Sequence, residues 1–416
     1  MKKPFDGLPF QSADILLPTG CDLQKWAVVA CDQYTSQPEY WERVERFVGG
    51  EPSALHLVLP ESSLDGPDVE NDITEINETM TRYLRAGRFR ELPDALIYVE
   101  RTLSGGAVRR GLVGKVDLEA YDYEEESRSP IRATEGTVFS RIPPRVAVRK
   151  NAPIELPHVM LLCDDPQQTV LEPLAKETGA MEPLYDFELM ENSGHLKGWL
   201  LNGEQKERVA NALHALQGTA EDAMLFAVGD GNHSLATARE CFERQKRITP
   251  PEQWDSLPAR WALVEVCNLH DPALVFTPIH RVVFDVEPQL LIKAFAASCP
   301  DAYIGEGAGI PLAFCHGGER GTVIVPDGER KIPAAILQGF LDAYLLENGG
   351  RVDYVHGEDT AEALSHRLRT VAFFLPALDK KTLFPAIKKS GPLPRKTFSV
   401  GRAEDKRFYL EARRIR

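Results

Sequence analysis

The sequence lacks the patterns that would indicate disulfide bonds, a zinc site or a membrane span. Its seven cysteines are odd in number, scattered and never spaced as Cys-x-x-Cys, which is typical of reduced thiols. No stretch approaches the roughly 18 consecutive apolar residues that a membrane-spanning helix needs. Near the start, Pro4 and Gly7 interrupt the apolar core that a signal peptide would have. We therefore expect a cytoplasmic protein with no membrane partner.

Basic residues are outnumbered by acidic ones. The chain has 48 lysines and arginines against 62 aspartates and glutamates, a formal net charge of −14. An acidic surface repels phosphate backbones, so nucleic acid is not an expected partner. No helix-turn-helix pattern is present, which argues against a DNA-partitioning role. A small-molecule partner fits better, and a phosphorylated one would need a local basic pocket.

Three familiar cofactor and nucleophile motifs are absent as well. The sequence contains no Gly-x-x-x-x-Gly-Lys-Ser/Thr loop and no Gly-x-Gly-x-x-Gly after an apparent strand. Neither a P-loop nor a Rossmann cofactor site is therefore indicated. A Gly-x-Ser-x-Gly elbow is missing too, which removes the usual signature of an α/β-hydrolase.

What the sequence does contain is the material of a packed α/β protein. Its 416 residues are 43% hydrophobic, 8% aromatic and 26% charged, enough for a core and two or three packed units. Apolar runs alternate with helical patterns, which predicts α/β or α+β architecture with mixed sheets and flanking helices. We expect an N-terminal segment at 1–130, a central domain at 131–285 and a C-terminal segment at 286–416. The expected strands are 55–60, 95–103, 108–116, 159–163, 223–228, 261–267, 311–316, 321–325 and 371–375, and the expected helices are 68–85, 204–216, 234–247, 288–297, 334–347 and 360–368.

The best candidate for an active centre is Gly229-Asp230-Gly231-Asn232-His233-Ser234, called the box below. It lies between an expected strand and an expected helix, where glycines allow close approach and the first helical amides attract an anion. Asp230 is a metal ligand or proton acceptor, and His233 a phosphate donor or acid–base group. The alternative is purely structural: Asp230 and Asn232 form the turn, and Ser234 caps the helix.

Several residues upstream of the box are further candidates. Glu135 lies in a turn-like Thr-Glu-Gly-Thr context and is either a base or a solvated surface residue. Pro143 and Pro144 suit the first turn of a helix that carries Arg145. Arg141 and Arg145 have guanidinium groups that suit phosphates, or they pair with the acidic run at 124–126.

Two polar and cationic turns lie later in the chain. The first contains His280 and Arg281, and the second contains Lys396 and Thr397. Each pair either reaches a shared cleft or forms an ordinary structural turn.

Taken together, these landmarks resemble domain-of-unknown-function family 1015, an uncharacterised bacterial and archaeal family. The matching pieces are Ala133-Thr134-Glu135-Gly136-Thr137, Arg141-Ile142-Pro143-Pro144-Arg145, Glu155-Leu156-Pro157-His158, the box, His280-Arg281-Val282-Val283 and Leu393-Pro394-Arg395-Lys396-Thr397-Phe398. The usual Asp-Gly-His-His-Arg box of that family is in turn similar to the box of ParB/sulfiredoxin-fold proteins, which include free serine kinases that use ATP or ADP.

This second resemblance implies a ParB/sulfiredoxin-like core and particular roles for residues. Asp230, Gly231 and His233 correspond to the phosphate-holding box, and Glu135 corresponds to the glutamate that takes the hydroxyl proton. Asn232 and Ser234 stand where the family has histidine and arginine, and the loss of that arginine leaves Arg141 or Arg145 to bind phosphate.

The resemblance favours a small-molecule phosphotransferase that uses ATP or ADP with Mg²⁺ near Asp230, acting on serine or a similar hydroxylated metabolite. Two alternatives stay open. One is a non-catalytic nucleotide-binding or phospho-metabolite-binding regulatory protein, and the other is a phosphoester hydrolase.

Overall fold

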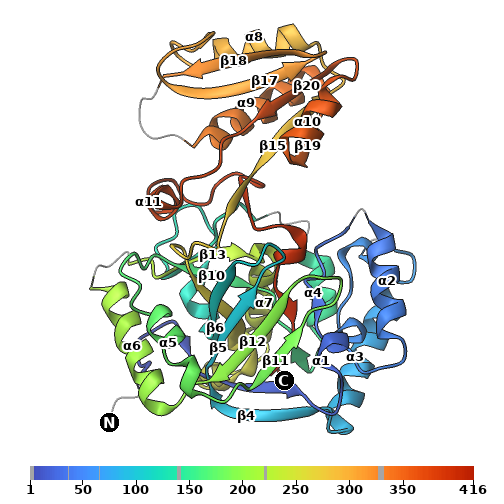
Figure 1. Cartoon of the computed structure of the whole chain (residues 1–416), viewed down its shortest axis with the longest axis vertical. Helices are drawn as coiled ribbons and strands as arrows, with labels where there is room; N and C mark the ends of the chain where they lie inside the picture. The colour runs from blue at the N-terminus through green and yellow to red at the C-terminus, as the bar shows by residue number, and fades with distance from the viewer. Residues whose placement is uncertain (1–3, 36, 65, 138–141, 220–222, 327–331) are drawn as a thin grey trace. The chain divides into compact units, whose positions relative to one another are not determined.

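The computed structural model describes residues 4–35, 37–64, 66–137, 142–219, 223–326 and 332–416. The chain divides into two compact units (Figure 1). The first unit comprises residues 1–274, 387–392 and 401–416, and the second comprises residues 275–386 and 393–400. The chain therefore leaves the first unit, builds the second, and returns to the first for its last residues.

A large mixed sheet forms the centre of the first unit. Parallel pairing joins β10 to β14 and β8 to both β7 and β13, and the other pairs along the sheet are antiparallel. The order across the sheet is β11 (Tyr185–Glu188), β12 (His195–Leu200), β5 (Ile97–Thr102), β6 (Val108–Asp117), β14 (Trp261–Asn268), β10 (Met160–Cys163), β13 (Phe226–Asp230), β8 (Ile131–Arg132) and β7 (Tyr121–Asp122), with β1 (Phe10–Gln11) beside β6.

Successive side chains of the central strands enter two different cores, because side chains alternate between the faces of a sheet. Leu112 of β6 and Val264 of β14 belong to one core, whereas their neighbours Val113 and Leu263 belong to the other. Both faces are therefore covered, which explains why these strands read as nearly continuous apolar runs.

The four longest helices of the first unit contribute buried residues to these two cores. Buried residues of α6 and α7 join the core that contains Val264, and those of α2 and α3 join the core that contains Leu263. Within the described ranges, every helix is too short or too polar to cross a membrane. The helices are α1 (Leu23–Trp26), α2 (Pro38–Val48), α3 (Val69–Arg85), α4 (Ile142–Arg149), α5 (Glu172–Ala175), α6 (Gly203–Gln217) and α7 (Asn232–Lys246).

The last residues of the chain are fastened to the first unit by short strand pairs. β22 (Phe408–Tyr409) pairs with β3 (Val28–Val29), and β23 (Arg413–Arg414) pairs with β9 (Ile154–Glu155). Ala412 forms a bridge to Leu16 in β2 (Ala13–Pro18), which itself pairs with β4 (Phe89–Ala95). Residues 401–416 thus complete the first unit after an excursion of more than a hundred residues.

The second unit is built on an antiparallel sheet. Helices α8 and α9 share one core with the sheet, and α10 belongs to a separate core. The order is β16 (Tyr303–Ile304), β18 (Glu319–Val325), β17 (Ile310–His316), β20 (Thr370–Phe374), β15 (Phe276–Phe284) and β19 (Arg351–His356), with β21 (Phe398–Val400) beside the start of β15. The helices are α8 (Pro288–Ser298), α9 (Pro333–Asn348), α10 (Glu358–Ser365) and α11 (Lys380–Ser390), whose residues from Ile387 on belong to the first unit.

The α/β class with mixed sheets and flanking helices is confirmed. The strand expected at 55–60 is wrong, because residues 54–57 form a 3-10 turn in which the Ser53 hydroxyl caps the Leu55 amide. This apolar run still buries Leu57 and Leu59, but without a strand partner. The nine-residue strand β15 was not expected, since Pro278 interrupts the apolar run within it.

Candidate functional site

The box lies where β13 ends and α7 begins. Asp230 is the last residue of the strand, Asn232 is the first residue of the helix, and Gly231 between them has φ of 82°. A Cβ atom on Gly231 would lie 3.1 Å from the Cα atom of Val159, so glycine suits both the left-handed backbone and the close packing. Gly231 also occupies the N-cap position, which places Ser234 inside the first turn and corrects the alternative that Ser234 is the cap.

The junction is partly exposed to solvent. Each residue from Gly229 to Ser234 is half-buried. The first amides of an α-helix have no partner within the helix, and the positive end of the helix dipole favours an anion there. The strand–turn–helix geometry expected from the sequence is therefore present, and its residues are only partly buried.

Asp230 forms an ion pair that the sequence gave no reason to expect. Its Oδ2 atom lies 3.2 Å from Nζ of Lys406, whose side chain is 8% exposed. Its Oδ1 atom accepts a hydrogen bond of 3.1 Å from the Gly231 amide. The carboxylate is thus held at the helix start by one backbone donor and one cation from the end of the chain.

Asn232 ties the box to the segment that contains Glu135. The Thr134 amide donates to Oδ1 of Asn232 at 3.1 Å, and Nδ2 of Asn232 lies 3.1 Å from the Thr134 hydroxyl. That hydroxyl donates to the carbonyl of Val228 in β13 at 2.6 Å. Because Glu135 follows Thr134 directly, these three hydrogen bonds bring the backbone of the candidate base beside the box.

Arg145 lies on a helix that packs directly against α7. Ile142 and Val146 of α4 share a small core with Ala236 and Cys241 of α7. This confirms the expected short helix that begins near the two prolines. Arg145 pairs with Glu61 at 2.7 Å rather than with the acidic run at 124–126, and Arg141 lies outside the described residues.

A chain of polar groups lies behind Gly231. His158 Cδ2 is 3.5 Å from the position that a Gly231 Cβ would take, and His158 Nδ1 lies 2.8 Å from the Tyr409 hydroxyl. That hydroxyl is 3.1 Å from the Cys31 sulfur. Burial raises the pKa of the Cys31 thiol to about 12, so this cysteine is protonated at neutral pH and is not a nucleophile there.

The two later candidate pairs lie in the second unit and take part in its own packing. The turn expected around His280 and Arg281 is wrong, because both residues lie within strand β15, whereas Lys396 does lie in a turn. His280 is buried and accepts a hydrogen bond of 3.2 Å from the Leu375 amide, and burial lowers the pKa of its imidazole. Arg281 is buried and donates to the carbonyls of Ile279 and Lys396. The Thr397 hydroxyl donates to the carbonyl of Pro394 at 2.6 Å.

Metal binding at the box would depend on a phosphate ligand. Among the described residues, no three His, Cys, Asp or Glu side chains are grouped to hold a metal ion. Asp230 offers a single carboxylate. Mg²⁺ is commonly bound by one or two carboxylates together with substrate phosphates, so the residues fit Mg²⁺ as a companion of a bound nucleotide.

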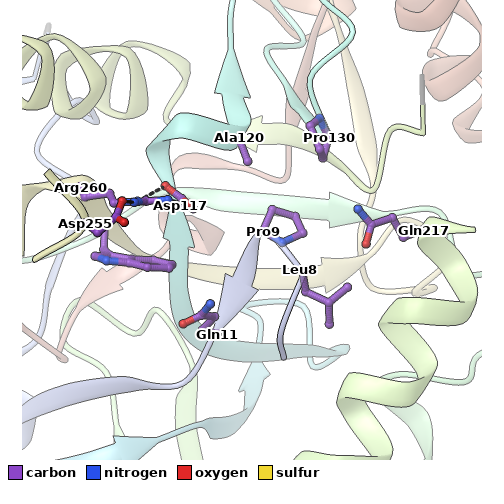
Figure 2. Close-up of a pocket in the computed structure, with 11 residues that line it drawn as sticks. Leu8, Pro9, Gln11, Asp117, Ala120, Pro130, Gln217, Asp255 and Arg260 are labelled. Carbon is purple, nitrogen blue, oxygen red and sulfur yellow. Dashed lines mark hydrogen bonds and ion pairs between the residues drawn. The ribbon is translucent and has the colours of Figure 1, made fainter. Parts of the chain in front are cut away.

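A separate cavity of about 420 Å³ lies elsewhere on the first unit (Figure 2). Its wall includes Trp261 and Arg260, and the Arg260 guanidinium pairs with Asp117 at 2.6 Å. Other lining residues are Leu8, Pro9, Gln11, Ala120, Pro130, Gln217 and Asp255. No box residue lines this cavity.

Sequence reasoning predicted the strand–turn–helix junction at the box and singled out the Thr134–Glu135 segment, but it missed three of their neighbours. His158 carried a signal, because it belongs to a motif already quoted from the sequence. Lys406 and Tyr409 carried none, since they lie more than 170 residues beyond the box and reach it only through the strand pairs of the C-terminal segment.

Comparisons with known proteins agree with the family resemblance. The model of a family described as "Protein of unknown function (DUF1015)" matches residues 3–344. No curated protein matches the chain.

Three solved structures show a distant likeness. A conserved hypothetical protein from Pyrococcus furiosus is 12% identical with a TM-score of 0.36, and it covers 71% of this chain and 90% of its own. A free serine kinase in complex with ADP is 10% identical with a TM-score of 0.40 and the same coverage. SbnI with a C-terminal truncation, from Staphylococcus aureus, is 10% identical with a TM-score of 0.38, covering 70% of this chain and 82% of its own.

Proposed function

The chain belongs to the DUF1015 family of proteins of unknown function, and we propose that it is a small-molecule phosphotransferase that uses ATP or ADP. The observation that carries this proposal is the hydrogen-bonded tie between Asn232 and Thr134. It joins an anion-attracting helix start to a segment with a carboxylate, and phosphoryl transfer requires both. Such transfer depends mainly on positioning and on neutralising charge.

In the proposed reaction, the phosphates of the nucleotide lie against the first-turn amides of Asn232, His233 and Ser234. The hydroxyl oxygen of the acceptor attacks the terminal phosphorus while its proton passes to the carboxylate of Glu135. A new P–O bond forms to the acceptor, and the bond to the leaving phosphate oxygen breaks. ATP would leave as ADP, or ADP as AMP, and serine would become phosphoserine.

Other residues of the site support this arrangement by charge. Mg²⁺ held by Asp230 and the phosphates would neutralise the terminal groups. Arg145 lies on the helix that packs against α7. It would contact a phosphate by exchanging its ion pair with Glu61 for one with the ligand. His233 would donate a hydrogen bond to a phosphate oxygen.

The test is a transfer assay with purified protein. ATP or ADP, Mg²⁺ and free serine are incubated with the wild type and with Glu135→Gln, and phosphoserine is measured by mass spectrometry. We expect product with the wild type and a reduction of at least about 100-fold in Glu135→Gln, because general base catalysis contributes about that much. Glu252→Gln, at an exposed position of the same unit, is the matched control and should keep full activity.

Failure to form product from serine and from a panel of other hydroxylated metabolites would remove the transferase proposal. Release of inorganic phosphate without an acceptor would instead indicate a phosphoester hydrolase.

One observation favours a second candidate, a nucleotide-binding regulatory protein without turnover. Asn232 replaces a histidine of the family's usual box, and its amide side chain cannot gain or lose a proton at neutral pH. That amide is hydrogen-bonded to Thr134. A box used in this way still binds an anion at its backbone amides. Calorimetry would then show nucleotide binding whose dissociation constant is unchanged in Glu135→Gln, with no product from any acceptor.

A further inference from the structure

The box contains an electrostatic conflict if it binds phosphates, as the proposed function requires. Asp230 places a carboxylate beside the amides that would face the ligand. Two negative groups at such short range repel each other strongly in a half-buried site. A protein cation beside Asp230 would offset this repulsion before any metal ion binds, and Lys406 already pairs with that carboxylate.

We propose that Lys406 is this cation, and that it binds the phosphate groups of the ligand while it remains paired with Asp230. This inference rests on the proposed function, to which it adds a ligand-binding residue. Nζ of Lys406 lies 3.2 Å from Oδ2 of Asp230. An ammonium group carries three N–H donors, so it can contact a carboxylate and a phosphate oxygen together.

Lys406 is held in place by fixed residues on both sides. The Asp405 carbonyl accepts a hydrogen bond of 2.9 Å from buried Arg109, and its carboxylate accepts one from the Ser104 amide. On the other side, the Arg407 carbonyl accepts a bond of 2.9 Å from the Ala30 amide. Lys406 therefore extends from a backbone that is anchored at both neighbouring positions, which reduces the entropy lost when it binds a ligand.

The Arg407 side chain strengthens this anchor from within the core. It lies 2.9 Å from Glu265 and 2.8 Å from Glu411, and it donates to the carbonyl of Pro157 at 3.0 Å. Pro157 precedes His158 and Val159, the residues that pack against Gly231. The same cluster of charges thus fixes both the residues behind Gly231 and the C-terminal segment that carries Lys406.

This arrangement predicts that the phosphate groups of a ligand can bind before any metal ion does. Because Lys406 already neutralises Asp230, a diphosphate should bind to the resting protein in the presence of EDTA. The experiment is calorimetry with inorganic pyrophosphate and with ADP, both in EDTA. It compares the wild type with Lys406→Gln, with Lys406→Arg, which keeps the charge, and with Lys176→Gln, an exposed lysine of the same unit.

We expect Lys406→Gln to weaken both ligands at least tenfold, Lys406→Arg to stay within about threefold of the wild type, and Lys176→Gln to change neither. Equal binding of pyrophosphate by Lys406→Gln and the wild type would overturn the proposal. If the wild type binds pyrophosphate but not ADP, and Lys406→Gln does not bind pyrophosphate, the phosphate-binding role of Lys406 is supported and the proposed nucleotide reaction is contradicted. If the wild type binds neither, both fail.

A second measurement on the unchanged protein covers the case in which Lys406→Gln does not fold. Lysines are acetylated at a limiting reagent concentration with and without saturating pyrophosphate, and the modified peptides are quantified. Pyrophosphate should slow the labelling of Lys406 at least threefold and leave Lys176 unaffected. Labelling of Lys406 at the same rate in both samples would overturn the proposal.

Discussion

At the scale of single residues, Asn232 and Thr134 determine where the candidate base lies. Their mutual hydrogen bonds, together with the bond from Thr134 to Val228, connect two segments almost a hundred residues apart. In the proposed reaction Asn232 would therefore be a positioning residue, and its amide suits that role because it offers a donor and an acceptor side by side.

We expect Asn232→Ala to detach the Thr134–Glu135 segment from the box. The Thr134 amide would lose its partner, at a cost of about 1–3 kcal/mol in the free energy of unfolding. Hydrogen exchange at the Thr134 amide should accelerate, and transfer activity should fall at least about tenfold with little change in nucleotide affinity. Asn211→Ala, on the exposed face of α6, is the control. Unchanged exchange at Thr134 would contradict the positioning role.

At the scale of secondary-structure elements, buried ion pairs fasten the C-terminal segment to the rest of the first unit. Glu265 of β14 is paired with Arg407, and Glu155 of β9 with Arg413. Burial raises the pKa of each carboxyl group, but the neighbouring guanidinium groups outweigh burial and hold both values below the ordinary range. Removal of one partner would leave a buried charge uncompensated.

The pH dependence of Glu265→Gln tests this coupling. At pH 7 the substitution should lower the free energy of unfolding by about 3–5 kcal/mol, because Arg407 and Arg109 lose a shared partner. The pKa of Glu265 is lower in the folded state, so its contribution is present above its ordinary pKa of 4.5 and is lost as the pH falls through the folded-state value. The difference between the two proteins should therefore narrow below about pH 4.5.

Urea unfolding at pH 7 and at a series of acidic pH values measures that difference. The exposed Glu252→Gln serves as the control, with no difference from the wild type at pH 7. A difference for Glu265→Gln that stays constant down to pH 3 would contradict the lowered pKa.

Some helices and strands could be predicted from the sequence alone, and some contacts could not. The expected helix at 68–85 appears as Val69–Arg85, and the strands expected at 95–103 and 108–116 appear as β5 and β6, which pair with each other. Local periodicity determines these elements, so the sequence suffices. The box was found for the same reason. Lys406 was not, because its contact with Asp230 depends on long-range strand pairing, which leaves no local pattern.

At the scale of the whole molecule, the second unit is an insertion into the first. Its first and last strands meet, because β15 pairs Phe276 with Val400 at the point where the chain enters and leaves. Paired strands are only about 5 Å apart. The large core of the second unit contains residues from α8, α9 and its own strands.

We therefore expect residues 275–400 to be replaceable by a short glycine–serine loop. The shortened protein should unfold cooperatively and retain pyrophosphate binding, with a modest fall in the melting temperature because residues 387–392 of the first unit are removed as well. Circular dichroism and calorimetry provide the measurements. A shortened chain that is folded but no longer binds pyrophosphate would show that the second unit contributes to the site.

The return of residues 401–416 to the first unit has a consequence for synthesis. The box and its supporting strands leave the ribosome early, whereas the segment that carries Lys406 emerges last. At usual translation rates the interval is on the order of ten seconds. During that time Glu265 and Glu155 lack their C-terminal partners Arg407 and Arg413. The nascent chain therefore exposes an incomplete edge of the core, which we expect a chaperone to bind.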